Sequence, residues 1–77
     1  MLFDLDHMNS AVVSISPDIM GGTPVFPGTR VPVHTLLVCI EAGDTIDEFL
    51  IGYPSVTRER VVAFLKRAVT LAVQEAA

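Results

Sequence analysis

The sequence has little positive charge, one cysteine and no tryptophan. Only five of its 77 residues are Lys or Arg, against nine Asp or Glu, so the formal net charge is −4. This sign argues against strong nonspecific binding to nucleic acid. Cys39 cannot form an internal disulfide, and with only two histidines beside it no closed zinc site can be built in one chain. We expect no disulfide, no metal site and no small-molecule cofactor.

Long apolar runs and a basic N-terminus are also absent. No run approaches the roughly 18–20 apolar residues that span a bilayer. Residues 1–6 carry two acids and no Lys or Arg, unlike the basic start of a signal peptide. We therefore predict a cytoplasmic protein that does not enter a membrane.

Apolar residues, in contrast, are abundant. They make up 51% of the chain, and charged residues only 18%, against a usual charged fraction of about 25%. A chain of 77 residues forms one domain, and a core of that size supplies about 3–5 kcal/mol. The composition leaves more apolar surface than a small monomer easily hides. We therefore predict a homo-oligomer, most simply a dimer.

Local signals divide the chain into a flexible lead-in over residues 1–10 and one domain over residues 11–77. β-branched residues predict a strand over 11–15. A Gly- and Pro-rich stretch over 21–32 excludes helix, and Pro27-Gly28 suits a type II turn inside a small hairpin. Apolar spacing and capping residues predict three helices, which cover residues 32 or 33 to 42, residues 46–51 and residues 58–74.

Capping residues place the helix ends. Gly43 follows the first helix as a left-handed cap. Thr45 and Glu48 form the T-x-x-E capping box of the second, and Thr57 is the N-cap of the third. The predicted fold class is mostly α, with a short N-terminal β arm or hairpin.

The helix predicted over 58–74 is apolar around too much of its circumference. Its apolar residues cover an arc of about 200°, whereas a surface helix needs about 100°. One interpretation is a helix wedged centrally in a single domain. The interpretation that we favour is contact with the domain's own core on one side and with another chain on the other. The candidate interface residues are Val62, Val69 and Val73.

No catalytic arrangement is evident, and we predict that the protein is not an enzyme. Helix capping accounts for Asp44, Asp47 and Glu48, and His34 lies off the apolar stripe of its helix. Arg30 is the only base in the first 57 residues. It either contacts a phosphate or an acid of a partner, or bridges to Asp47 or Glu48. The second alternative is the one that we favour.

A short capped helix, a turn and a longer helix with a polar start form the outline of a helix-turn-helix motif. The second helix of such a motif presents its first residues to the major groove of DNA. Arg58 and Arg60 are therefore the candidates for contact with base edges, and Lys66 and Arg67 for contact with phosphates.

Residues 15–33 carry a specific sequence pattern. It reads Asp18, Gly21-Gly22, Pro24, then Gly28-Thr29-Arg30-Val31-Pro32-Val33. The pattern resembles the opening signature of the small prokaryotic family called domain of unknown function 433. The similarity continues through residues 41–48 and Tyr53-Pro54 into the last helix. The loop residues that carry the family motif are Gly21, Gly22, Pro24, Gly28, Thr29, Arg30 and Pro32.

The resemblance implies a homeodomain-like or winged-helix-like three-helix domain. Members are often encoded beside a PIN-like ribonuclease toxin and are assigned as its antitoxins by genomic association. The leading hypothesis is thus an antitoxin that binds and neutralises a nuclease toxin and also binds its own operator DNA. The alternatives are a helix-turn-helix transcription regulator without a toxin, and a structural dimerisation module.

Overall fold

Within residues 12–76, three α-helices follow an irregular stretch. The computed structural model describes residues 12–76. A single 3₁₀ turn, η1, spans Met20–Gly22. The α-helices are α2 (Val33–Glu41), α3 (Ile46–Gly52) and α4 (Arg58–Ala76). The mostly helical fold predicted from the sequence is confirmed, and the predicted lead-in over residues 1–10 lies outside the described residues.

The caps predicted from the sequence set the helix boundaries. Gly43 has φ 95°, and its N–H bonds to the Ile40 carbonyl while that of Asp44 bonds to the Cys39 carbonyl. These two bonds are the Schellman arrangement that ends a helix. At the start of α4, the Thr57 hydroxyl accepts the Arg60 N–H at 3.2 Å, as an N-cap does.

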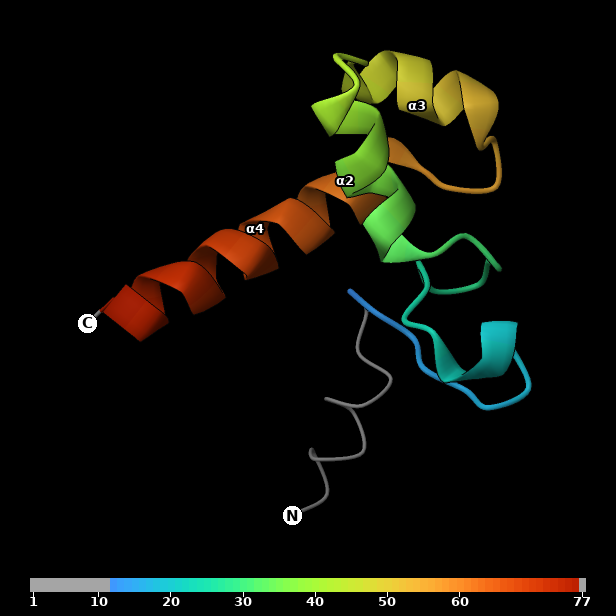
Figure 1. Ribbon diagram of the computed structural model, residues 1–77, viewed down its shortest axis with the longest axis horizontal. Coiled ribbons are helices and arrows are strands. Elements are labelled where there is room, and N and C mark those ends of the chain that lie inside the picture. The colour runs from blue at the N-terminus through green and yellow to red at the C-terminus, as the bar shows by residue number, and fades with distance from the viewer. Residues whose placement is uncertain (1–11, 77) are drawn as a thin grey trace.

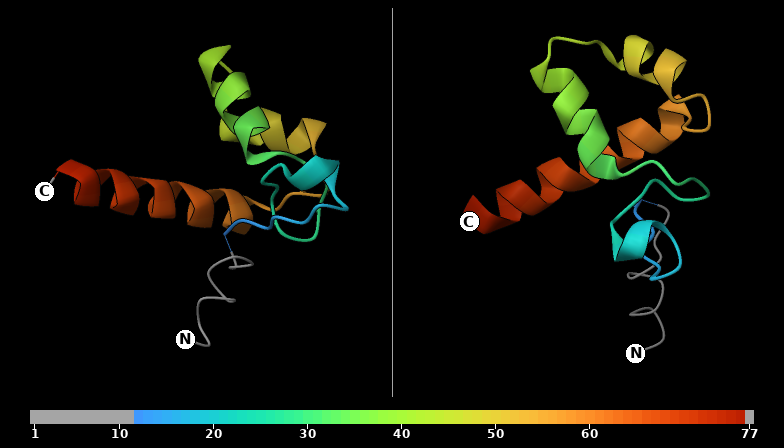
Figure 2. Two further views of the ribbon diagram at one scale, coloured as in Figure 1. Left: turned by 60° about the horizontal axis from the view of Figure 1, so that its bottom comes forward. Right: turned by 45° about the vertical axis from the view of Figure 1, so that its right-hand side comes forward.

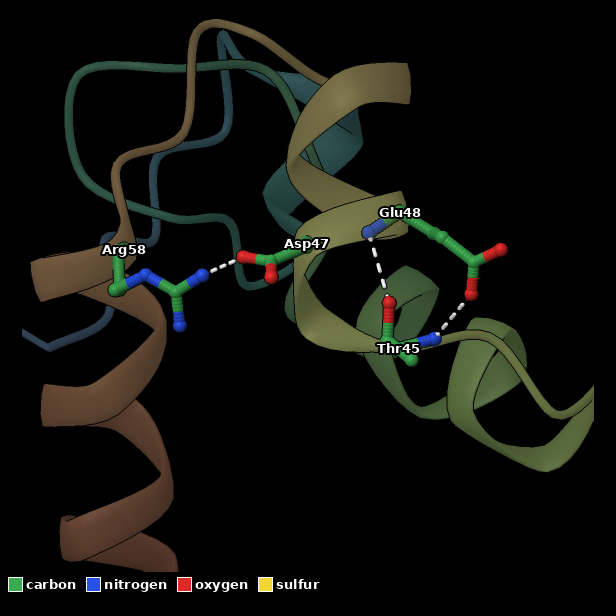
Figure 3. A network of polar contacts seen from close by, with 4 residues as sticks. All are labelled: Thr45, Asp47, Glu48 and Arg58. Atoms are coloured by element: carbon green, nitrogen blue, oxygen red, sulfur yellow. Dashed lines mark hydrogen bonds and ion pairs between the residues drawn. The ribbon is translucent and has the colours of Figure 1, made fainter.

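The start of α3 is held by a complete capping box (Figure 3). The Glu48 N–H donates to the Thr45 hydroxyl at 3.1 Å, and the Thr45 N–H donates to the Glu48 carboxylate at 2.7 Å. The backbone hydrogen bond from Thr45 lowers the pKa of Glu48, because it favours the charged carboxylate. Asp47, in the same turn, forms an ion pair with Arg58 at the start of α4.

The stretch before α2 forms bridges rather than strands. Ser14 and Val25 exchange two backbone hydrogen bonds of 2.9 Å, and Val25 also pairs with Pro32 in an isolated antiparallel bridge. No strand forms within residues 12–76, so the predicted strand and β arm are not confirmed. The prolines at 24, 27 and 32 lack the N–H donors that a longer ladder needs.

The turn predicted at Pro27-Gly28 is present. The Thr29 N–H bonds to the Phe26 carbonyl at 3.1 Å, and Gly28 has φ 75°, as the third position of a type II turn requires. The Thr29 side chain is buried. Its hydroxyl donates to the Phe26 carbonyl and accepts the Val31 N–H. The hydrogen bonds of the Thr29 side chain therefore stabilise the turn together with its backbone hydrogen bond.

We expect Gly28→Val to lower the free energy of unfolding by more than about 1 kcal/mol, because a β-branched residue is strained at positive φ. A Cβ at position 28 would meet no atom within 4 Å, so the backbone conformation alone carries the effect. Thermal melts measure it. Gly52→Val is the matched control, because Gly52 is equally open and has no positive φ. Equal melting of Gly28→Val and wild type would contradict the strain.

The core joins the loop to all three helices. Phe26, Leu36, Phe49, Val56 and Val61 form one buried cluster. The ring of Phe26 lies 6.1 Å from that of Phe49 and 5.8 Å from that of Phe64, between ring centroids. The pair with Phe64 is edge-to-face and the pair with Phe49 is tilted, and aromatic pairs at such separations add to the burial energy. A residue of the Gly- and Pro-rich loop thus occupies the centre of the core.

The three helices differ in which of the other helices lie close to them. α3 contacts both α2 and α4, whereas no Cα atom of α2 lies within 8 Å of a Cα atom of α4. In Figures 1 and 2 the first half of α4 passes beneath α2, and the second half extends away from the other helices.

Candidate protein-interaction site

An apolar groove of about 390 Å³ lies between α2 and α4. It exists because α2 and α4 are held apart while each presents apolar side chains to the space between them. Leu37 and Ile40 are 50% and 42% exposed, and Phe64 and Leu65 form the opposite wall. The residues that line the groove are Val33, His34, Leu36, Leu37, Ile40, Phe64, Leu65 and Ala68.

The second half of α4 is an exposed helix with apolar residues. Every residue from 66 to 76 is exposed. Val69 and Val73 are each 62% exposed, and Leu71 is 45% exposed. Most helical stability in proteins comes from packing an apolar face. Ala68 lines the groove, but Val69 and Val73 leave most of their surface exposed. These two side chains are therefore free to contact another chain.

The predicted interface residues lie along α4 as one row. Val62 is half-buried, and Val69 and Val73 follow it into the exposed half of the helix. At 100° per residue they fall within about 40° of one another. The structure thus brings these three residues to one flank, which also carries a shallow depression between Val62, Val69 and Lys66.

The four residues predicted to contact DNA differ in their exposure and in their direction around the axis of α4. The guanidinium of Arg58 is engaged by Asp47 (Figure 3), and Arg60 is half-buried. Lys66 and Arg67 are exposed. At 100° per residue Arg58 and Arg60 lie about 160° apart around the helix axis. The start of α4 therefore does not present these two arginines in one direction.

Arg30 does not make the contact that we favoured. Asp47 pairs with Arg58, and the Glu48 carboxylate accepts the Thr45 N–H. Both acids are therefore already engaged by neighbours closer along the chain. Arg30 is exposed and forms no ion pair within residues 12–76. Its other interpretation, contact with a partner, is the one that the structure leaves open.

The other loop residues of the motif have structural roles. Gly21 and Gly22 form most of η1. The Pro24 carbonyl accepts the N–H of Val33, the first residue of α2, and Pro32 takes part in the bridge to Val25. Together with the turn at Gly28 and the Thr29 hydroxyl, these contacts fix the path of the chain into α2.

Potential metal ligands do not cluster in the described part of the chain. No group of three or more His, Cys, Asp or Glu side chains that could hold a metal ion occurs within residues 12–76. Cys39 packs half-buried against the core, and His34 is exposed at the edge of the groove. None of the helices in the described part of the chain has the length and apolar character of a membrane span.

Sequence reasoning missed the groove itself. The i, i+3, i+4, i+7 stripe of α2 includes Leu37 and Ile40, and such a stripe predicts residues that face the core. In the structure only Leu36 of α2 is buried. It packs in one core cluster with Phe49 of α3 and Val61 of α4, whereas Leu37 and Ile40 line the groove. The signal that could have revealed the groove is the amount of apolar surface in this stripe, which is more than the short helix α3 can cover.

Comparisons with known proteins agree with the architecture. The model of the family described as "Protein of unknown function (DUF433)" matches residues 13–66. The uncharacterised protein y4eO of Sinorhizobium fredii (strain NBRC 101917 / NGR234) is 42% identical over 59 residues, which are 74% of this chain and 27% of that protein. The chain thus corresponds to about a quarter of the length of this relative.

A solved structure has a similar fold. The crystal structure of a DUF433 member protein from Anabaena variabilis ATCC 29413 superposes with a TM-score of 0.68 and 27% sequence identity. The similarity covers 95% of this chain and 72% of that one. The arrangement of the helices is therefore shared with that protein.

Proposed function

The chain belongs to the DUF433 family of proteins of unknown function, and on that premise we propose that it is a non-enzymatic antitoxin that binds and neutralises a PIN-like ribonuclease toxin. The groove between α2 and α4 is the surface that receives the toxin. The protein acts by occupying the nuclease, and its own residues carry out no reaction.

The observation that carries this proposal is the apolar groove on so small a domain. Large apolar patches on the surface of a soluble protein mark sites of interaction. A groove bordered by helices is suited to an amphipathic helix of a partner, whose apolar side chains enter it at helical spacing. Leu37 and Ile40 on one wall and Leu65 on the other provide that apolar contact.

Arg30 supplies the charged part of the same recognition. Its loop is fixed by the buried ring of Phe26 and the two hydrogen bonds of the Thr29 hydroxyl, so its backbone is already ordered before a partner binds. A guanidinium pairs bidentately with a carboxylate. A nuclease whose site is rich in carboxylates offers such groups, and Arg30 has no competing acid within residues 12–76.

The test of this proposal begins with the neighbouring reading frame. If it encodes a small nuclease rich in carboxylates, the two proteins are produced together with a tag on the nuclease alone. We expect a stoichiometric complex and loss of ribonuclease activity on a synthetic RNA. Full ribonuclease activity in the presence of excess protein would overturn the proposal. It would leave the transcription regulator and the structural dimerisation module as the remaining functions.

Operator binding is the second function that we propose, because α3, the turn at residues 53–57 and α4 follow one another in the order of a helix-turn-helix motif. Lys66 and Arg67 are exposed and available for phosphates. Arg58 would have to leave Asp47 before it could reach a base edge.

For a dimer that places two or three bases per chain on phosphates, we expect log affinity to fall with log salt with a slope of about −4 to −5. Lys66→Ala should flatten the slope by about 2, because the dimer loses two phosphate contacts. Arg60→Ala should instead relax sequence preference. Fluorescence anisotropy on the upstream region of the operon, with scrambled DNA as control, measures both. Equal binding to the two DNAs would remove operator recognition.

A further inference from the structure

A second face of α4, which meets the groove at Leu65, has the pattern of a coiled-coil seam. Alternate steps of three and four residues connect five apolar positions along its length, which are Val62, Leu65, Val69, Ala72 and Ala76. Such 3–4 spacing is the a and d pattern that pairs two helices. With 1.5 Å per residue the seam is about 21 Å long, and its second half lies on the exposed part of α4.

The sizes of these side chains indicate how a second copy fits. Large residues occupy the first part of the seam, and alanines the last part. When two copies run in opposite directions, Leu65 faces Ala76 of the partner subunit, and Val69 faces Ala72 of the partner subunit. Each layer then combines a large and a small side chain, which interdigitate without voids. In a parallel pair the alanine layers would instead face one another and leave the contact underfilled.

The charges favour the same direction. Lys66 and Arg67 lie at the start of the exposed half of α4, and Glu75 lies near its end. Antiparallel pairing brings the basic start of one helix to the level of the acidic end of the other. Parallel pairing brings like charges to the same level. The dipoles of the two helices also oppose each other favourably in the antiparallel pair.

We propose that α4 pairs with α4 of a second copy in an antiparallel, two-fold symmetric contact centred between Val69 and Ala72. A two-fold axis makes each contact occur twice, so the Leu65–Ala76 layer and the Val69–Ala72 layer each form two times, and Val62 lies outside these four layers. Around the axis of α4, the seam centres about 80° from Ala68, which lines the groove. Leu65 belongs to both surfaces, so the dimer covers one edge of the groove and leaves its α2 wall, with Leu37 and Ile40, open for the toxin of the proposed function.

The first experiment compares two exposed positions of α4. Val69→Lys places a charge in the seam, and Gln74→Lys places the same charge on the opposite side of the helix, about 140° away. Both residues are exposed in the single chain, so circular dichroism should show unchanged helix content. In sedimentation equilibrium we expect a dimer for the wild type and Gln74→Lys, and a monomer for Val69→Lys. A monomeric wild type, or a dimeric Val69→Lys, would overturn the proposal.

The second experiment tests the direction of pairing. In a chain with Cys39→Ala, Val69→Cys and Ala72→Cys are made separately, and one of the two carries a mass tag. Disulfides require Cα atoms about 4.4–6.8 Å apart. On mild oxidation of the mixture, the antiparallel seam predicts mainly disulfides between the two variants. Disulfides mainly within each variant would show a parallel pair and overturn the proposal.

These measurements need no nuclease, so their outcome is separate from that of toxin binding. The proposal rests on the proposed function only in assigning the groove to the toxin. Inhibition of the nuclease by monomeric Val69→Lys would leave both proposals standing, because it would show that the groove works without the seam. Failure of the wild type to dimerise alongside full inhibition of the nuclease would overturn the seam alone.

Discussion

Phe26→Ala is expected to unfold most of the protein at room temperature. Phe26 has an exposed fraction of 0% and contacts the rings of both Phe49 and Phe64. Truncating a buried Phe to Ala costs about 3–5 kcal/mol, and the whole core of so short a chain supplies about the same amount. The lost ring also removes the anchor that holds the Gly- and Pro-rich loop against the helices.

Urea titration followed by far-UV circular dichroism measures the loss. Ile51→Ala is the control, because Ile51 is 80% exposed and surface substitutions usually change stability by less than about 0.5 kcal/mol. All variants must be compared at one protein concentration, since dimerisation adds to apparent stability. A Phe26→Ala midpoint close to that of the wild type would show that the core does not depend on this ring.

The parts of the fold that could be predicted from the sequence are those set by neighbours in the chain. Thr45 and Glu48 are three residues apart, and their reciprocal hydrogen bonds form as soon as α3 does. Gly43 and the turn at Gly28 follow from the positive φ that only glycine adopts without strain. Such interactions depend on a few adjacent residues, so they can be predicted without knowledge of the rest of the chain.

The parts that could not be predicted depend on distant residues. Phe26 stands in a loop that sequence reasoning assigned to a hairpin, yet it meets Phe49 and Phe64 from two different helices. The ion pair of Asp47 with Arg58 forms across the turn between α3 and α4. Arg30 was predicted to bridge to Asp47 or Glu48, but Asp47 pairs with Arg58 instead.

The candidate site also has a part that could be predicted from the sequence and a part that could not. The wide apolar arc of α4 follows from helical periodicity, so its row of valines was predicted by residue number. The groove depends on how far α2 lies from α4, where no Cα atoms of the two helices come within 8 Å of one another. Periodicity shows which side chains share a face but does not show which of those faces a neighbouring helix covers.

Two adjacent apolar residues of α2 provide a test of the groove, because both are exposed and only one of them lines it. Leu37 is 50% exposed and Val38 is 48% exposed. Leu37 lines the groove, whereas Val38 does not. An acidic substitution at either position therefore makes a similar change in charge, helix context and exposed area, and only one of the two changes the groove.

We expect Leu37→Asp to weaken binding to the nuclease encoded in the neighbouring reading frame by roughly a hundredfold, and Val38→Asp to leave it nearly unchanged. Burying a Leu side chain is worth about 1.5–3 kcal/mol, and each 1.4 kcal/mol is a factor of ten in affinity. The carboxylate adds a further cost, because it would enter an apolar contact without a partner.

Isothermal titration calorimetry with a catalytically inactive nuclease gives the dissociation constants, and sedimentation should show that both variants still dimerise through α4. Equal affinity of Leu37→Asp and wild type would place the toxin on another surface, and equal loss in both variants would show that α2 as a whole, rather than the groove, makes the contact.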